Sequence, residues 1–287
     1  MKTFNKIFSI IALVGVGTLG CGAQDFTFGV GVQGQLNTLD IDGVAQSSDL
    51  GFGSGAGVLV DVGLQLNDNW SIHSGVGYSM LRSRANIGRL AGSEAAVDRE
   101  GEDFTFMFEL SQYVEEQRFN NISIPLAIQY ESSGNTRFYA RAGGSYNLLT
   151  GSKQESRAGR LTTSGFFPRF NGTLTAPAFA GFGSYGEIEF EERDLDLENS
   201  INIILESGVK QMLNNGSSIY VGAFAEIGMS DISNDNPKRE LLSYNAGNPL
   251  KFIGNGTFDS NTGGIAAVEE AKLLFVGIRL RYQFGSK

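Results

Sequence analysis

Apolar or small side chains occupy every second position over residues 52–66. A side-chain period of two is that of a β-strand, which would then have one apolar face and one small or polar face. The stretch is long enough to cross a bilayer as a tilted strand, which takes about 9–11 residues. The alternating positions are Phe52, Ser54, Ala56, Val58, Val60, Val62, Leu64 and Leu66.

Seven other stretches repeat this alternation, so the pattern predicts eight strands. A soluble sheet can alternate in the same way. Repetition after an export signal, with glycine frequent on the second face, favours a membrane barrel instead. The other predicted strands cover residues 26–36, 70–80, 122–130, 138–148, 201–209, 219–229 and 274–284.

Short turns and long connections alternate between these strands. Outer-membrane barrels have short periplasmic turns and longer extracellular loops. The sequence therefore predicts an all-β fold, an eight-stranded antiparallel up-and-down transmembrane β-barrel in a bacterial outer membrane, with both termini in the periplasm. The short turns lie at 67–69, 131–135 and 213–217, and the long segments at 82–118, 150–198 and 231–271.

Two parts of the long segments also alternate, at residues 104–109 and 186–191. We expect strands to continue beyond the membrane there, so that the long extracellular loops form hairpin extensions. If these parts crossed the membrane, the barrel would have ten or twelve strands. Their many acidic residues argue against this alternative, because a Glu facing lipid is costly.

Residues 1–23 have the features of a cleaved signal peptide. A basic start precedes an apolar run at 7–19 that is too short for a transmembrane helix. Small residues then lead to a cleavage point after Ala23. The mature chain would be one outer-membrane barrel domain, residues 24–287.

Cys21 is the only cysteine of the chain. Acylation of Cys21, as in a lipoprotein, is the alternative to cleavage, but Thr18 stands where a lipoprotein signal normally has Leu. If Cys21 leaves with the signal peptide, the mature chain has no disulfide, no Cys-ligated metal and no Cys nucleophile.

The formal net charge is −9, and loss of Lys2 and Lys6 with the signal peptide lowers it by two, to −11. Because nucleic-acid binding requires a basic face, nucleic acid is not expected as a partner. Two acid clusters, at 40–42 and 231–235, lack the spacing and the Gly of a calcium-binding loop. The sequence therefore predicts no metal and no cofactor.

Four stretches between residues 122 and 284 share the order and character of strands in one known family. In that order they resemble the PorT-like, porin-family outer-membrane barrels of Bacteroidota. The resemblance implies a small barrel of the OmpA or OmpX type; the family's best-known member assists protein secretion, and no motif here carries that role. The stretches are Ile122-Ser123-Ile124-Pro125-Leu126, Phe138-Tyr139-Ala140-Arg141-Ala142-Gly143-Gly144, Ile227-Gly228-Met229-Ser230-Asp231-Ile232 and Val276-Gly277-Ile278-Arg279-Leu280-Arg281-Tyr282-Gln283-Phe284.

Six ionisable side chains are predicted to point into the lumen, at similar height. The interior of an eight-stranded barrel is only wide enough to be filled by side chains. We therefore interpret these residues as an ion-pair network that satisfies buried charges, with Arg141 bound to Glu206 and Asp61 bound to His73. A proton path or a catalytic cluster is the alternative. The six are Asp61, His73, Arg141, Glu206, Arg279 and Arg281.

No catalytic residue is predicted, because the only histidine, His73, lies on the filled side of the barrel. The sequence favours a non-enzymatic barrel that anchors acidic extracellular loops for surface interaction or envelope structure. The expected partners are outer-membrane lipid, lipopolysaccharide and a surface or envelope protein. A small pore, or an accessory component of a secretion or assembly complex, is the alternative function.

Overall fold

A computed structural model describes residues 26–43, 49–234, 239–262 and 264–285, and the expected signal peptide lies outside these residues. None of the described segments is a helix of the length and hydropathy needed to cross a bilayer.

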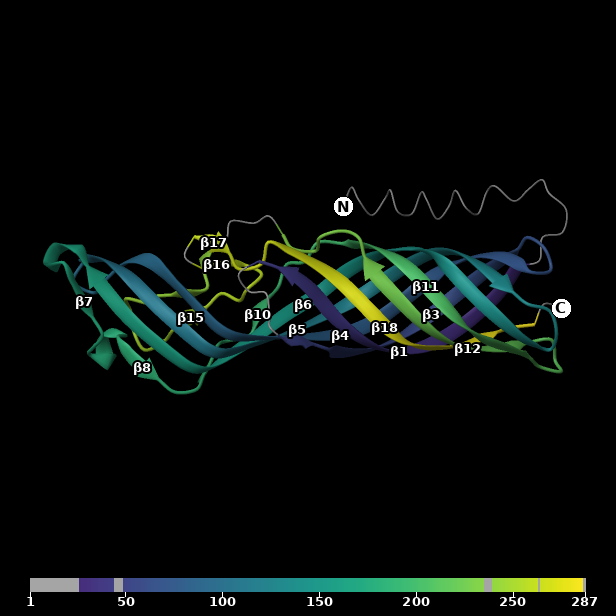
Figure 1. Cartoon of the computed structure of the whole chain (residues 1–287), viewed down its shortest axis with the longest axis horizontal. Helices are drawn as coiled ribbons and strands as arrows, with labels where there is room; N and C mark the ends of the chain where they lie inside the picture. Colours follow the sequence, from purple (N-terminus) through teal and green to yellow (C-terminus); the bar gives the residue numbers. More distant parts are fainter. Residues whose placement is uncertain (1–25, 44–48, 235–238, 263, 286–287) are drawn as a thin grey trace.

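Eight antiparallel strands form a closed ring in an elongated molecule (Figure 1). The ring closes because the first strand pairs with the last one as well as with its successor. Closure removes the free sheet edges at which backbone donors and acceptors would face lipid without a partner. The predicted eight-stranded fold is thus confirmed. The strands are β1 (Phe26–Asp42), β3 (Gly53–Gln65), β4 (Trp70–Val97), β5 (Asp103–Glu131), β6 (Thr136–Phe167), β11 (Ser200–Met212), β12 (Ser218–Gly228) and β18 (Glu270–Gln283).

The outer face of the ring is apolar, as the alternation predicts. Side chains such as Leu126 and Ile278 are 64% and 65% exposed, which suits an environment of acyl chains. Their neighbours along each strand point inward and are buried or half-buried. The outward positions near the middle of the strands are Val60, Val76, Leu126, Ala142, Leu205, Ala223 and Ile278.

Pro125 interrupts the ladder between β4 and β5, because it has no backbone N–H. The hydroxyl of Ser74 donates a hydrogen bond of 2.8 Å to the Pro125 carbonyl oxygen. An unpaired backbone group in lipid costs several kcal/mol, so this lone polar side chain on the lipid side of β4 has a structural use.

Three strands are far longer than a bilayer requires. β4, β5 and β6 have 28, 29 and 32 residues, against about 9–11 for a crossing. The expected membrane crossings on β4 and β6 ended at residues 80 and 148, and the expected crossing on β5 began at residue 122. Each is therefore part of a longer strand. Beyond the ring, β4, β5 and β6 continue as a three-stranded sheet, hereafter the extension (Figure 1).

The connections at 168–198 and 231–269, and the segment just before β3, contribute short elements that border or cover the extension. Of the predicted alternation at 186–191, only two residues become a strand, and they pair with β6. The short elements are β2 (Asp49–Gly51), η1 (Pro168–Phe170), β7 (Gly172–Leu174), η2 (Ala178–Ala180), β8 (Gly183–Tyr185), β9 (Ile188–Glu189), β10 (Arg193–Asp194), β13 (Arg239–Glu240), β14 (Leu242–Ser243), β15 (Ile253–Gly254), β16 (Ser260–Thr262) and β17 (Ile265–Ala266).

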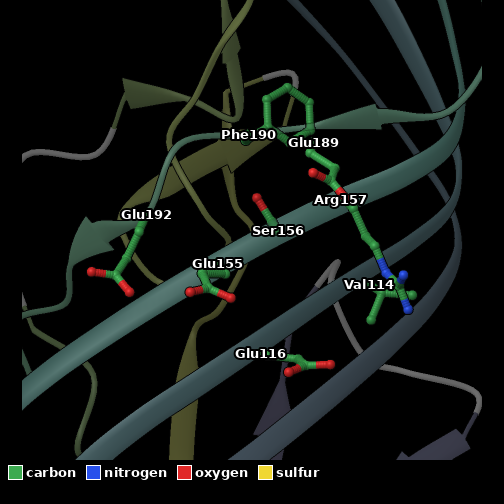
Figure 2. Close-up of a pocket in the computed structure, with 8 residues that line it drawn as sticks. All are labelled: Val114, Glu116, Glu155, Ser156, Arg157, Glu189, Phe190 and Glu192. Atoms are coloured by element: carbon green, nitrogen blue, oxygen red, sulfur yellow. The ribbon is translucent and has the colours of Figure 1, made fainter.

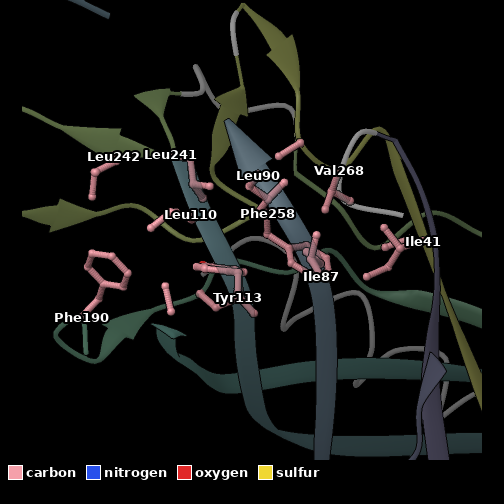
Figure 3. Close-up of a cluster of buried hydrophobic side chains, with 14 of the residues drawn as sticks. Ile41, Ile87, Leu90, Leu110, Tyr113, Phe190, Leu241, Leu242, Phe258 and Val268 are labelled. Carbon is pink, nitrogen blue, oxygen red and sulfur yellow. The ribbon is translucent and has the colours of Figure 1, made fainter. Parts of the chain in front are cut away.

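The extension contains much of a hydrophobic core that continues into the adjoining end of the ring (Figure 3). One face of its sheet is apolar, and the connections lay apolar side chains against it. Burial of this area stabilises the extension away from the membrane. Buried residues from the sheet include Ile87, Leu90, Phe104, Phe106, Leu110 and Tyr113, and those from the connections include Phe190, Leu241, Leu242, Phe258 and Val268.

A buried carboxylate ties the connection before β16 to the sheet. Glu115 accepts hydrogen bonds from the Thr257 N–H (2.8 Å) and the Thr257 hydroxyl (2.9 Å). It also accepts one from the Tyr113 hydroxyl and one from the Gln117 amide. Farther along the same connection, the Glu269 N–H donates to the Asp42 carbonyl at the end of β1. The connection is therefore hydrogen-bonded both to β5 and to the end of β1.

Candidate functional site

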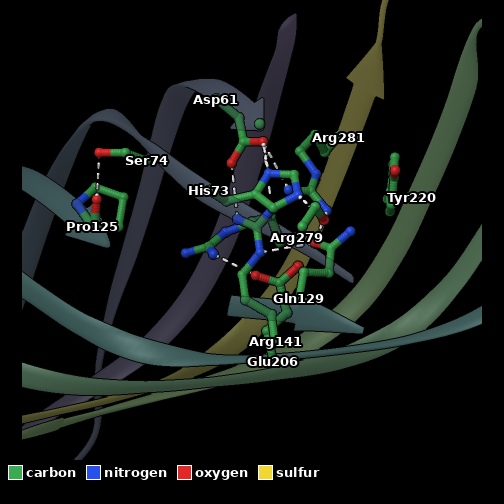
Figure 4. Close-up of polar contacts among 12 residues, drawn as sticks. Asp61, His73, Ser74, Pro125, Gln129, Arg141, Glu206, Tyr220, Arg279 and Arg281 are labelled. Atoms are coloured by element: carbon green, nitrogen blue, oxygen red, sulfur yellow. Dashed lines mark hydrogen bonds and ion pairs between the residues drawn. The ribbon is translucent and has the colours of Figure 1, made fainter. Parts of the chain in front are cut away.

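Asp61 is the centre of an ion-pair group inside the ring (Figure 4). Its Oδ1 lies 2.9 Å from Arg141 Nη1, and its Oδ2 lies 2.7 Å from His73 Nδ1 and 3.0 Å from Arg281 Nη1. All four side chains are buried. They come from β3, β4, β6 and β18, so this group links strands from several sides of the barrel.

A second group forms around Glu206. Its Oε2 lies 2.6 Å from Arg279 Nη1, and its Oε1 accepts a 2.7 Å hydrogen bond from the Tyr139 hydroxyl. Arg279 also lies 3.5 Å from a carboxylate oxygen of Glu226 and donates to the side chain of Gln33. Every charge in this group faces an opposite charge or a hydrogen-bond partner, as burial requires.

The expected pair between Arg141 and Glu206 is not formed. The two residues are directly opposite each other on β6 and β11, as the sequence register implied. The guanidinium of Arg141 instead reaches across the lumen to Asp61 on β3, and it donates to the side chain of Gln129, its register partner on the neighbouring strand β5. The six predicted residues therefore belong to two groups rather than one layer, because in a narrow lumen a long side chain reaches the far wall as easily as its neighbour.

A third group, at the turn end of the barrel, was not predicted. Glu131 lies 2.8 Å from Lys210 and accepts a 2.8 Å hydrogen bond from the Tyr220 hydroxyl. The sequence interpretation placed Glu131 in a turn, although its position continues the inward period of β5. Continuing the alternation of β5 to its last residue would have predicted that Glu131 points inward. Tyr220 also stacks under Arg281, whose guanidinium carbon lies 4.1 Å from the ring centroid.

Ser71, His73 and Asp61 have the hydrogen-bond order of a serine-hydrolase triad. Ser71 Oγ lies 3.0 Å from His73 Nε2, and His73 Nδ1 lies 2.7 Å from Asp61 Oδ2. Ser71 and His73 are each only 3% exposed, so a substrate carbonyl has no access to the hydroxyl. Asp61 is also bound by two arginines, whereas the corresponding carboxylate of a triad serves to orient the histidine. The arrangement is a packed part of the lumen.

The far end of the extension has a cavity of about 470 Å³, hereafter the tip pocket. It lies between the turn that joins β4 to β5, the segment from η1 to η2, and the connection around Tyr244. Phe170 and Phe179 are 68% and 77% exposed at its border, an uncommon position for large apolar side chains. The aromatic and apolar lining residues are Phe167, Phe170, Leu174, Pro177, Phe179, Phe182, Tyr244 and Pro249.

Charged side chains hold the border of the tip pocket in place. Arg99 donates to the carbonyl oxygens of Ala246 (2.9 Å) and Gly247 (2.7 Å), which ties the β4–β5 turn to the connection. Arg169 lies 3.0 Å from Glu102. These contacts join segments that are far apart in sequence, so they fix the walls of the pocket relative to one another.

Glu94, on β4, binds the connection around Tyr244. Its carboxylate accepts a hydrogen bond from the Tyr244 N–H. Burial raises the pKa of the Glu94 carboxyl above its ordinary value, and the nearby Glu240 carboxylate raises this pKa as well. We therefore expect the contact between the sheet and the connection to weaken as Glu94 loses its proton.

An acidic cleft of about 400 Å³ lies beside β5 and β6, nearer the barrel (Figure 2). Glu116, Glu155, Glu189 and Glu192 line it, together with Arg157. Within the described ranges, no three His, Cys, Asp or Glu side chains are grouped so as to hold a metal ion.

Comparison with known proteins gives a family match and several structural likenesses. The family model "Outer membrane protein beta-barrel domain" matches residues 22–201. Neisserial surface protein A is 11% identical, with a TM-score of 0.34, over 90% of this chain and 97% of its own. Ail, the attachment invasion locus protein of Yersinia pestis, is 11% identical, with a TM-score of 0.33, over 91% of this chain and 99% of its own. No protein of curated function matches the sequence significantly.

Proposed function

The chain belongs to the family of outer-membrane β-barrel domains, and we propose that its barrel is a closed, non-enzymatic anchor for an extracellular extension whose tip contacts a partner at the cell surface. In this arrangement the turns and both termini are periplasmic. Within the family, we assign the chain to the PorT-like barrels of Bacteroidota, on the four sequence stretches described above.

The observation that carries this proposal is the contrast between the two ends of the long strands. Inside the ring, the ionisable side chains of the two central groups are buried and paired with one another. At the tip, Phe170 and Phe179 are exposed beside an apolar pocket. Side chains that are engaged with each other do not favour passage of a solute, whereas exposed aromatic residues are typical of contact sites.

The test is photo-crosslinking on intact cells, with a photo-reactive amino acid at Phe179. A partner protein or surface polymer should be captured there, and not from the lipid-facing control position Val221. The variant Phe170→Ser with Leu174→Ser should abolish the capture, because both side chains line the pocket and are exposed. Equal capture in this variant and the wild type, or no capture at Phe179, would contradict the proposal.

A further inference from the structure

The apolar outer face of the barrel ends abruptly on three neighbouring strands. On β4 the outward residues are apolar or small up to Met80, and the next outward residue is Arg82. On β5 the first outward charge beyond the apolar stretch is Arg118, and on β6 it is Lys153. These charges therefore mark the height at which acyl chains give way to headgroups.

The three cations form a row across the sheet. Arg82 is the register partner of Arg118, and Arg118 is the register partner of Lys153. All three side chains are exposed on the same face. Like charges directly opposite each other destabilise a sheet, so the row costs stability unless an anion lies over it.

Carboxylates of the extension compensate only part of this charge. Arg118 lies 3.2 Å from Glu155, and Lys153 is bound to Glu192. Arg84, one step farther from the lipid face, lies 3.9 Å from Glu116. Among the described residues, Arg82 has no ion pair, although it is nearest to the apolar surface.

A cavity of about 430 Å³ opens at the same place. Its lower part is apolar, lined by Ala56 and Met80, and its upper part is polar, lined by Arg82, Arg118 and Asn120. The Tyr78 hydroxyl donates a 3.1 Å hydrogen bond to Asn120 Oδ1, which orients the amide.

We propose that this cavity, hereafter the headgroup site, binds a phosphate group on the headgroup of lipopolysaccharide in the outer leaflet. Guanidinium groups donate paired hydrogen bonds to phosphate oxygens, and the apolar floor suits the start of an acyl chain. The assignment to lipopolysaccharide rests on the proposed orientation, in which the extension is extracellular. It does not depend on a partner at the tip pocket.

The experiment measures binding of purified full-length protein in micelles to lipid A that carries its phosphates, by native mass spectrometry. The variant Arg82→Gln with Arg118→Gln should bind this lipid about tenfold or more weakly. Arg89→Gln is the matched control, since Arg89 is an exposed arginine of the same strand, farther along the extension and bound to Glu109. It should bind as the wild type does. Heat-dependent gel migration shows that each variant is folded.

Three further ligands decide what the site recognises. Dephosphorylated lipid A should bind about tenfold or more weakly than the phosphorylated form, and inorganic phosphate should not displace it. Equal binding of both lipid A forms, or wild-type affinity in the double variant, would overturn the headgroup site. Displacement by inorganic phosphate would show an anion site without lipid specificity. Equal affinity for phosphatidylglycerol would overturn the lipopolysaccharide assignment, while capture at the tip would be unaffected.

Discussion

At the scale of residues, the lumen is organised by the ion pairs that its carboxylates form with its arginines. Among the residues that the structure describes, Asp61 is the only carboxylate bound to Arg141 and Arg281, whereas Arg279 has both Glu206 and Glu226. Alternation along the strands is sufficient to predict that such side chains point inward. It does not predict the partners of the arginines, because most of these partners lie on strands that are not neighbours and depend on the stagger of the strands around the ring.

Asp61→Asn should therefore be the most damaging single change in the lumen. It leaves two buried guanidinium groups without a carboxylate, which typically costs about 3–5 kcal/mol. Glu206→Gln should cost less, because Arg279 keeps Glu226 at 3.5 Å. Urea unfolding of both variants in lipid vesicles gives the comparison. Equal losses of stability would mean that the two groups are not organised in this way.

Glu94 gives the extension a pH dependence with a defined sign. Burial raises its pKa in the folded state above the ordinary value of 4.5. The folded protein then binds more protons than the unfolded chain, so this residue's contribution to stability falls as pH rises from about 4.5 through the folded pKa.

Glu94→Gln should remove this loss and make the contact with the connection around Tyr244 more stable at neutral pH. The amide keeps an oxygen that accepts the Tyr244 N–H. Hydrogen exchange of that N–H should slow in the variant at pH 7.5 and differ little from the wild type at pH 4. Faster exchange in the variant at neutral pH would show that the charge is needed there.

At the scale of elements, close contact between neighbouring strands depends on glycine at particular positions. A Cβ added at Gly75 of β4 would lie 2.0 Å from the carbonyl oxygen of Val60, beside Asp61. A Cβ added at Gly34 of β1 would meet nothing within 4 Å. Both glycines belong to barrel strands, but Gly75 is at an inward position and Gly34 at an outward one.

Gly75→Ala should cost about 1–3 kcal/mol through overpacking, and Gly34→Ala should change stability by less than about 0.5 kcal/mol. Paired unfolding measurements in vesicles test this difference. Equal tolerance of the two changes would indicate that the faces of the strands are assigned wrongly, since a slip of one residue exchanges them.

The strand ends show where sequence analysis was insufficient. The expected crossings on β4, β5 and β6 cover only the apolar part of each strand, because apolar alternation is a signal of lipid contact. Beyond Met80 the alternation continues with charged outward residues such as Arg82 and apolar inward ones such as Ile87. It shifts by one position at Gly88 and then places Leu90 inward. The connections that cover these residues come from 168–198 and 231–269, and their packing is a tertiary effect that local pattern does not encode.

At the scale of the whole molecule, the proposed orientation has one end of the long axis in the periplasm and the other outside the cell. A Cys introduced at Phe179, in the tip, should react with a membrane-impermeant maleimide on intact cells. A Cys introduced at Asn215, in the β11–β12 turn, should react only after the outer membrane is permeabilised. Reaction at Asn215 on intact cells would reverse the orientation.

Conductance recording of the purified wild-type protein in planar bilayers tests most directly whether the barrel is closed. The paired groups around Asp61 and Glu206 fill the ring with side chains that are buried and bound to one another. We expect the protein to insert, as judged by its protection from protease in vesicles, and yet to produce no stable conductance steps. Stable, ohmic steps from the inserted wild-type protein would contradict this expectation and would make the barrel a pore.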